Sequence, residues 1–478
     1  MKSTLCQILP AMLVAFPLGL SDLEAQEPDF DEHFHDRTMR VDYFHSGSAG
    51  TEIVSLDRVV SDGPWAGPRT RLVDDSNLGK YRFEIHDAST GSLLYSRGFA
   101  SIYGEWETTA EADQVFRTFH ESLRFPWPRE PVRVLLYRRT GPESFEPVWE
   151  TVVDPASRFV NAADRGPGGA VHTIFENGPP TEKVDLVLVG EGYTGDQESK
   201  FLADARRLTD ALFGTEPFRS RRADFNVRAV LVPAERPGVN RPQVGEFRRT
   251  PLSTEYNIFD SERYLLTLDN RALREALSGV PYEFVEILVN EKQYGGGGIF
   301  NFQATVAVDT EFADYVFVHE FGHHFAGLAD EYYTSDVAYE TGGDTHPEPW
   351  EPNVTALHDP AALKWGDLVE RGTPLPTPWE KQAYEEHSRR IRAERKALVE
   401  RSAPESEFDE LFERQRQIER EMLSAMRYAN RVGAFEGAMY EAEGLYRPEI
   451  DCIMFTRAAY FCRVCRRAIE RIIDLYAG

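Results

Sequence analysis

Residues 312–332, FADYVFVHEFGHHFAGLADEY, carry the strongest structural signal in the sequence. Its first residues supply an apolar helix face and Gly327 follows the last of them, which predicts a buried helix that ends at this glycine. Three of the chain's 12 histidines lie within six positions here. Because residues i and i+4 share a helix face, we expect His319 and His323 to point at the same place.

The residue types in this stretch suit one zinc ion. Two imidazoles on one helix face can bind the metal, while Glu320 can hold and deprotonate a water molecule on the metal's open side. A catalytic zinc needs a third protein ligand, and two carboxylates, Asp330 and Glu331, follow the break at Gly327. Either can complete the set. His324 points away from the pair, so we expect it to support the site or fill the core.

The first part of the chain, residues 26–165, is predicted to be a β-rich domain with the architecture of a sandwich. Between residues 40 and 153, short runs of alternating apolar and polar residues, such as 132–137, are separated by turn-forming clusters. The glycine-rich and proline-containing stretch 165–169 suits a linker. A second domain is therefore expected over residues 166–478.

The second domain begins with a pattern of alternating strands and helices. An apolar run at 184–189, a helical pattern at 196–213 and another apolar run at 225–232 predict an α/β layer. Four consecutive glycines at 295–298 precede a strand and lack the ending of a phosphate-binding loop, so we interpret them as a flexible loop. The strand that follows, 302–308, is expected at the sheet edge, where an extended substrate could pair with it.

A charged segment interrupts the second domain. Between residues 378 and 430 the composition shifts to Glu, Arg and Gln, with apolar residues at seven-residue spacing. Pro404 divides this segment, which predicts a helical hairpin insertion.

Composition and the start of the chain limit the classes of function. The formal net charge of -26 makes nucleic acid an unsuitable partner, because binding phosphates requires clustered Lys and Arg. Residues 1–25 have the basic start, apolar core and small-residue end of a signal peptide, so we expect a secreted protein. No later stretch approaches the roughly 20 apolar residues of a membrane helix.

Three cysteines remain after Cys6 leaves with the signal peptide: Cys452, Cys462 and Cys465. In an exported protein we expect two of them to form a disulfide and one to stay free. A structural zinc site on these thiols is a weaker alternative, because their segment contains no histidine to serve as a fourth ligand.

The chain resembles the IgA peptidase family of zinc metallopeptidases over nearly all of its length. The motifs that carry the resemblance lie at residues 319–323, 327–332, 295–298, 446–448, 452–454 and 461–465. The resemblance implies a zincin-type catalytic domain behind a β-rich domain, zinc as the cofactor, and peptide bonds in proteins or peptides as the substrate. It does not imply that the substrate is an immunoglobulin.

The same resemblance ranks the candidates for the third ligand. In the broader metzincin pattern a glycine follows the second histidine by three positions and the ligand follows by six, whereas here Gly327 and Asp330 each lie one position further on. The step from glycine to ligand is preserved, so Asp330 is favoured and Glu331 stays open. The comparison also implies that Met454 packs beneath the zinc in a methionine turn.

These observations predict an α+β, multidomain fold: an N-terminal β-sandwich followed by a zincin-like α/β metallopeptidase domain with a helical hairpin insertion. The predicted function is a secreted zinc endopeptidase with ligands His319, His323 and Asp330 and the general base Glu320. One alternative is a surface protein that binds protein or glycan with a vestigial zinc site, although the intact glutamate argues against it. Another is a zinc amidase acting on cell-wall peptides. Acidic clustering suggests a possible calcium site at Asp336, Asp344 and Glu348.

Overall fold

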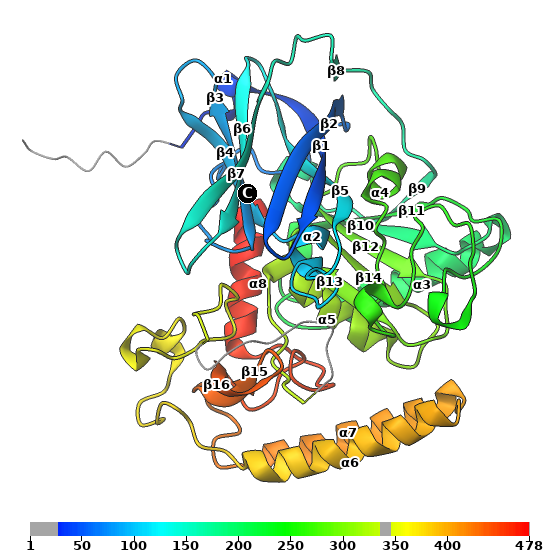
Figure 1. The fold of residues 1–478 in the computed structure, drawn as a ribbon, viewed down its shortest axis with the longest axis vertical. Helices are drawn as coiled ribbons and strands as arrows, with labels where there is room; N and C mark the ends of the chain where they lie inside the picture. The colour runs from blue at the N-terminus through cyan, green and yellow to red at the C-terminus, as the bar shows by residue number, and fades with distance from the viewer. Residues whose placement is uncertain (1–26, 335–345, 478) are drawn as a thin grey trace, which may run out of the picture.

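A computed structural model describes residues 27–334 and 346–477 (Figure 1). The predicted signal peptide at 1–25 lies outside the described residues, as do Asp336 and Asp344 of the suggested calcium site. No helix in the described part of the chain is long and apolar enough to cross a membrane.

The predicted β-rich region contains two four-stranded sheets. One sheet joins β5 (Arg117–Pro128), β1 (Phe34–Ser48), β2 (Thr51–Ser61) and β8 (Val160–Asn161) in this order. The other joins β4 (Leu93–Phe99), β3 (Tyr81–Asp87), β6 (Val132–Arg139) and β7 (Phe145–Val153). Both contribute to one apolar core, in which Tyr43 stacks on Trp149 with ring centroids 6.0 Å apart. The alternation in the sequence is explained by one buried and one solvated face of each sheet.

The second part of the chain is built on a six-stranded sheet. Its order is β13 (Gly296–Ile299), β14 (Gln303–Ala307), β12 (Phe284–Val289), β10 (Val184–Glu191), β11 (Phe225–Leu231) and β9 (Ala170–Phe175). The central strand β10 is buried along its whole length. Leu186 and Leu188 face one apolar core and Val187 and Val189 face another. Burial on both faces explains the continuous apolar run in the sequence.

Helices cover both faces of this sheet. One face packs against α3 (Glu198–Leu212), α5 (Ala313–Ala326) and α8 (Arg463–Tyr476), and the other against α4 (Asn270–Ala276). The helix with the histidines is α5. It contacts β13 and β14 directly, so the histidines lie at one end of the sheet.

The prediction that 302–308 forms the sheet edge is wrong, and so is the prediction of a flexible glycine loop. The strand β14 lies inside the sheet, parallel to β12 on one side and antiparallel to β13 on the other. Three of the four glycines, Gly296, Gly297 and Gly298, form β13 together with Ile299, and β13 is the edge strand next to the histidine helix.

The glycine run is explained by the close approach of α5 to this edge strand. A Cβ atom on Gly298 would lie 2.4 Å from the carbonyl oxygen of Glu320, and one on Gly296 would lie 2.6 Å from a side-chain carbon of Val316. On the other face, a Cβ on Gly297 would lie 2.6 Å from the ring of Tyr264. Glycine is needed here because any side chain would separate the strand from its neighbours.

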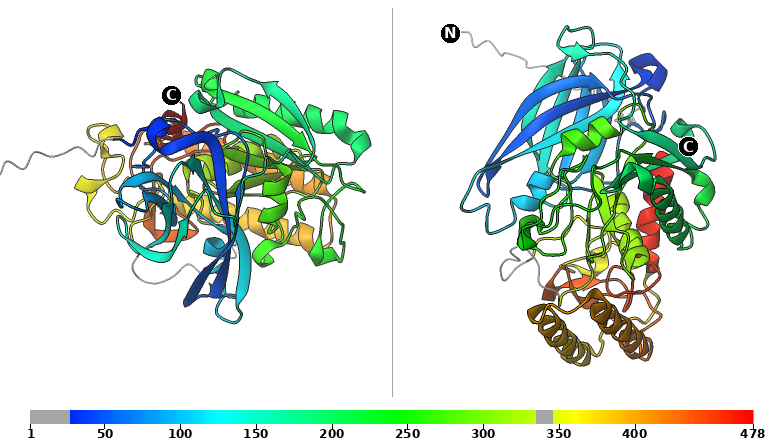
Figure 2. Two further views of the ribbon diagram at one scale, coloured as in Figure 1. Left: turned by 90° about the horizontal axis from the view of Figure 1, so that it is seen from above. Right: turned by 90° about the vertical axis from the view of Figure 1, so that its right-hand side faces the viewer.

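Two helices occupy the predicted insertion, α6 (Lys381–Glu400) and α7 (Glu405–Ser424), with Pro404 between them. The ring of Phe412 contacts those of Tyr294 and Phe312, each at a centroid distance of 5.8 Å. The hairpin therefore packs beside the start of α5. The views in Figure 2 place it at the end of the molecule away from the two four-stranded sheets. A small hairpin of β15 (Phe435–Ala438) and β16 (Glu441–Arg447) follows.

The two parts of the chain meet next to the glycine strand. The amide of Ala100 donates to the carbonyl of Phe300 at 2.9 Å, and the side-chain amide of Asn301 donates to Gly98 at 3.0 Å. On the other side of the interface, Arg124 donates to the carbonyl of Tyr282 at 2.9 Å. The N-terminal sheets thus hold the segment that follows β13.

A buried histidine should make the N-terminal sheets sensitive to alkaline pH. His45 lies between Glu121 and Glu52, with nitrogen–oxygen distances of 2.9 and 2.8 Å. Burial lowers the pKa of His45, but the two carboxylates outweigh burial and raise the pKa from 6.5 to about 9. A raised folded-state pKa gives a stabilisation that is complete below the unfolded value and is lost as pH rises through the folded one.

We therefore expect the free energy of unfolding to fall between pH 6.5 and about 9, and His45→Gln to flatten that part of the profile. Urea denaturation followed by tryptophan fluorescence across this range measures both. The exposed His35→Gln is the control and should keep the wild-type slope. An equally steep slope in His45→Gln would contradict the assignment.

The glycine strand yields a second prediction. Gly298→Ala should force α5 away from β13 and cost about 1–3 kcal/mol of unfolding free energy, which is typical of overpacking. The matched control is Gly50→Ala, because a Cβ at that position meets nothing within 4 Å. Denaturation curves of the two variants should separate clearly, whereas equal stabilities would refute the steric explanation.

Candidate functional site

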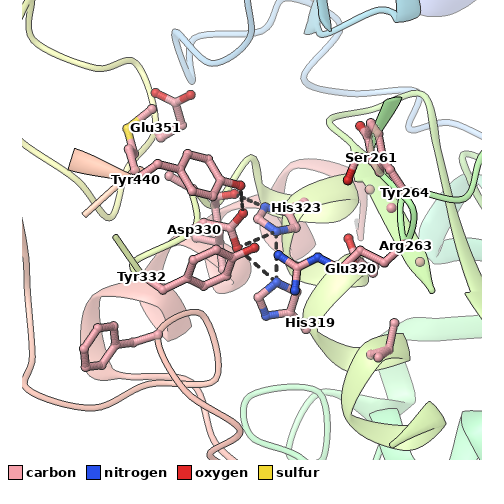
Figure 3. Close-up of a pocket in the computed structure, with 18 of the residues that line it drawn as sticks. Ser261, Arg263, Tyr264, His319, Glu320, His323, Asp330, Tyr332, Glu351 and Tyr440 are labelled. Atoms are coloured by element: carbon pink, nitrogen blue, oxygen red, sulfur yellow. Dashed lines mark hydrogen bonds and ion pairs between the residues drawn. The ribbon is translucent and has the colours of Figure 1, made fainter. Parts of the chain in front are cut away.

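A cleft of about 480 Å³ opens over the histidine helix (Figure 3). Its lining comes from β13, α5, the loop after α5, the α6–α7 hairpin, and α2 (Ile102–Trp106) with neighbouring loops of the N-terminal part. It includes Gly298, His319, Glu320, Asp330 and Tyr440. Both parts of the chain therefore shape the cleft, although the histidines come from one helix.

Three side chains meet at a single point on the floor of the cleft. The Nε2 atoms of His319 and His323 lie 3.2 Å apart. The Oδ1 atom of Asp330 lies 3.1 Å from the first nitrogen and 3.3 Å from the second. The structure thus brings together the three residues that the sequence analysis selected as metal ligands.

The turn at Gly327 brings Asp330 back to the helix. Gly327 ends α5 with a φ of 61°, in the left-handed region that favours glycine. A Cβ atom at this position would also lie 2.7 Å from the ring of Trp350. The amide of Leu328 donates to the carbonyl of Gly322 at 3.3 Å, which folds the chain back along the last turn of α5.

The hydrogen bonds of the two imidazoles fix the direction of their lone pairs. His319 Nδ1 lies 2.9 Å from the carbonyl of Ile453, and His323 Nδ1 lies against the carbonyl of Leu328. A carbonyl only accepts, so each Nδ1 carries the proton and each neutral ring presents the Nε2 lone pair to the other ring and to Asp330. Three acceptors that converge in this way can share one positive charge between them, which either a proton or a metal ion can provide.

The spacing of these atoms fits a metal ion. Tetrahedral ligands at about 2.1 Å from a zinc-sized ion lie about 3.4 Å from one another, close to the observed 3.1–3.3 Å. Nitrogen and carboxylate donors are those that zinc accepts. The residues present therefore fit a divalent metal, with three protein ligands and one side left open to the cleft.

The pKa shifts of Asp330 and His323 are consistent with a cation held between the three side chains. Burial alone would raise the pKa of Asp330, but the adjacent histidines hold it well below its usual range. Burial alone would lower the pKa of His323, but Asp330 raises it to about 9. Without a metal, a proton on His323 balances the carboxylate, and a bound cation would take over that role.

Glu320 lies beside the three residues, on the side of β13. A Cβ on Gly296 would lie 3.2 Å from Glu320 Cγ, so the side chain lies against the glycine strand, and it lines the cleft. Burial raises the pKa of Glu320, although the neighbouring histidines and Arg263 oppose this. A carboxylate of raised basicity next to a metal position can accept a proton from water.

Three further residues shape the site, and sequence reasoning did not select them. The hydroxyl of Tyr440 donates to Asp330 Oδ2, and the ring of Tyr332 lies parallel to His319 at 6.4 Å. The side chain of Arg263 extends into the cleft toward the histidines (Figure 3). Tyr332 belongs to the motif at residues 327–332. Arg263 and Tyr440 come from distant segments, and the composition of those segments does not indicate a functional site.

The remaining residues predicted near the site have other surroundings. His324 points into the core, where its Nε2 accepts from the amide of Val285 at 3.1 Å, and burial lowers its pKa to about 3. Met454 packs under the helix, since a Cβ on Gly322 would lie 3.1 Å from its sulfur. Glu348 pairs with Lys364 at 3.0 Å.

The expected disulfide is absent from the described residues, where Cys452, Cys462 and Cys465 are all free. They surround Glu331, whose Oε1 accepts from Cys465 at 3.3 Å. Glu331 therefore points to the side opposite the histidines.

Two family models match the chain. The model described as IgA Peptidase M64 matches residues 173–473, and the model of the Peptidase M64 N-terminus matches residues 29–150. No curated protein matches the chain. The first match alone covers more than half of the sequence and includes His319, Glu320, His323 and Asp330. The chain belongs to the IgA peptidase M64 family of peptidases.

Proposed function

We propose that this protein is a secreted zinc-dependent endopeptidase that hydrolyses peptide bonds in proteins. The observation that carries the proposal is the convergence of three lone pairs, from two imidazoles and a carboxylate, next to Glu320 in an open cleft. Membership in a peptidase family supports the substrate class. The signal-peptide pattern of residues 1–25 supports secretion.

His319, His323 and Asp330 would hold the zinc ion. When bound, zinc lowers the pKa of a water molecule and polarises the carbonyl of the scissile bond. Glu320 removes a proton from the attacking water and delivers it to the nitrogen of the leaving amine. Arg263 reaches into the same cleft, where its positive charge stabilises negative charge that develops on the carbonyl oxygen.

The glycine strand is the best candidate for binding the substrate main chain. On the outer side of β13, Gly296 pairs with the 263–265 segment and Phe300 accepts from Ala100. Alternation along the strand turns the amide and carbonyl of Gly298 to this same outer side. In the described part of the chain no hydrogen bond reaches them there. An extended peptide would therefore pair at Gly298, and its side chains would enter the surrounding pockets.

The proposal is tested with a mixed peptide library incubated with and without a chelator and analysed by mass spectrometry. Internal cleavage that depends on metal supports an endopeptidase. Release only from cell-wall peptides would favour the amidase instead, and binding without cleavage would favour a protein- or glycan-binding function.

Glu320→Gln separates catalysis from metal binding. We expect it to retain zinc and to lose about 10²–10⁴-fold in turnover, because it removes the proton acceptor and leaves the ligands intact. Metal analysis and peptidase assays on one preparation measure both quantities. Substantial residual turnover in this variant would exclude Glu320 as the base.

Asp330→Asn tests the third ligand. The amide keeps the shape of the side chain but removes its negative charge, so the variant should lose most of its catalytic zinc and activity. Asp113→Asn, an exposed position that does not line the cleft, is the matched control. Full zinc occupancy of the histidine site in Asp330→Asn would assign the third ligand to another residue.

A further inference from the structure

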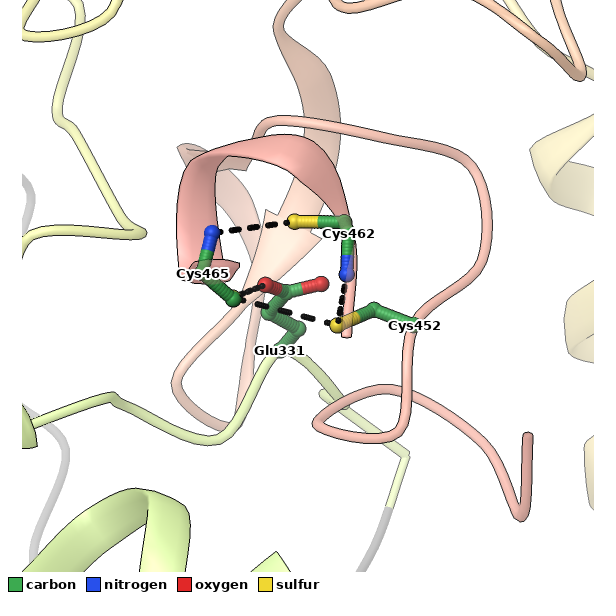
Figure 4. A group of neighbouring side chains, drawn as sticks. All are labelled: Glu331, Cys452, Cys462 and Cys465. Atoms are coloured by element: carbon green, nitrogen blue, oxygen red, sulfur yellow. Dashed lines mark hydrogen bonds between the residues drawn. The ribbon is translucent and has the colours of Figure 1, made fainter. Parts of the chain in front are cut away.

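A second cluster of side chains that could bind a metal ion surrounds Glu331 (Figure 4), whereas its neighbour Asp330 contacts the histidines. It consists of Glu331, Cys452, Cys462 and Cys465, whose donor atoms all lie within 4.8 Å of one another. Each residue is at most 2% exposed. The members come from the loop after α5, the turn at 452 and the start of α8, so the fold itself assembles the group.

Distances within the cluster match those around one zinc ion. The sulfurs of Cys452 and Cys465 lie 3.8 Å apart, and the sulfur of Cys465 lies 3.3 Å from Glu331 Oε1. Thiolates at about 2.3 Å from zinc in a tetrahedral site lie about 3.8 Å apart. The spacing of Cys462 and Cys465, with two residues between them, is also typical of zinc sites.

Two of the sulfurs accept hydrogen bonds from backbone amides, as metal-bound thiolates do. The amide of Cys462 donates to the sulfur of Cys452 at 3.3 Å, and the amide of Cys465 donates to the sulfur of Cys462 at 3.4 Å. Backbone amides directed at sulfur stabilise thiolates. A disulfide would use only two of the three sulfurs and leave the third beside the carboxylate.

The carboxylate of Glu331 independently indicates that a cation belongs in the cluster. Glu331 Oε1 accepts from Asn353 at 3.0 Å, but the buried Oε2 has no hydrogen-bond partner within the described residues. A buried carboxylate oxygen without a partner is costly and rare. A cation at the centre of the cluster would provide the partner.

Another group of neighbouring acidic residues serves as a comparison, because it needs no bound cation. Asp42, Asp57 and His120 also lie within 4.8 Å of one another. Their carboxylates are already paired with the arginines Arg40, Arg58 and Arg271. That group is neutralised by the protein itself, whereas no Lys or Arg forms an ion pair with Glu331 in the described chain.

We propose that Glu331, Cys452, Cys462 and Cys465 bind a second, structural zinc ion. Four protein ligands close the site, and its complete burial leaves no position for substrate, which distinguishes structural from catalytic zinc. Thiolate ligands select zinc over magnesium and calcium.

The second ion would hold the two segments that position the catalytic ligands. Asp330 precedes Glu331 directly, and the carbonyl of Met454 accepts from the amide of Glu331 at 2.8 Å. The carbonyl of Ile453, next to Cys452, accepts from His319 Nδ1 at 2.9 Å. Metal binding at the cysteines would therefore fix the backbone on both sides of the catalytic centre.

The test uses full-length protein and counts metal per chain by elemental analysis. We expect two zinc equivalents in the wild type and one in the double variant His319→Ala/His323→Ala, which removes the catalytic set but retains the cysteines. Cobalt bound to that double variant should give the near-ultraviolet absorption of sulfur-to-cobalt charge transfer. Because the cysteines are intact, this readout does not depend on a cysteine variant that fails to fold.

Glu331→Gln, introduced in the same double variant, should weaken the remaining zinc, measured by competition with a chromogenic chelator. The exposed Glu443→Gln in that background is the control and should leave zinc affinity unchanged. A double variant without zinc, cobalt absorption without a sulfur contribution, or an intact mass lower by two hydrogens would each overturn the proposal. Two zinc equivalents in a wild-type chain that cleaves no peptide would refute the peptidase function alone.

Discussion

The reversal of the chain at Gly327 is the constraint on which the whole centre depends. Two histidines on one helix face supply only two ligands, and a straight continuation of α5 would carry every later side chain away from them. The left-handed turn, with φ at 61°, folds the chain back so that Asp330 Oδ1 lies 3.1 Å from His319 Nε2. A side chain at position 327 would be strained and would also collide with Trp350.

The returning segment serves two groups at once. Asp330 faces the histidines and its neighbour Glu331 faces the cysteines, as successive side chains of an extended backbone do. The 452–454 turn also contacts both groups. Cys452 belongs to the cysteine cluster, while the carbonyl of the next residue, Ile453, orients His319. The hairpin of β15 and β16 supports the same segment, because the amide of Met439 donates to the carbonyl of Asp330 at 3.0 Å. Disturbance of either group is thus expected to reach the other through a shared backbone.

The glycine strand connects this centre to the N-terminal sheets. Because three of the four residues of β13 are glycines, α5 packs directly against it, and Glu320 lies along the same edge that faces the cleft. The residues just after the strand bond to Gly98 and Ala100 of the N-terminal region. The close approach therefore brings helix, sheet edge and N-terminal region into one wall of the cleft.

The features that depend on local periodicity could be predicted from the sequence. The i and i+4 spacing placed His319 and His323 on one helix face, and the alternating and continuous apolar runs identified the β-rich region and the central strand β10. The breaker at Pro404 likewise separated α6 from α7.

The tertiary structure alone decided the order of strands in the sheet, which made the glycines an edge strand and placed 302–308 inside. Tertiary packing also places Glu331 next to three cysteines, and it places Arg263 and Tyr440 in the lining of the cleft. Local patterns report which face of an element is buried, whereas these contacts join segments far apart in the chain and depend on how the elements pack together.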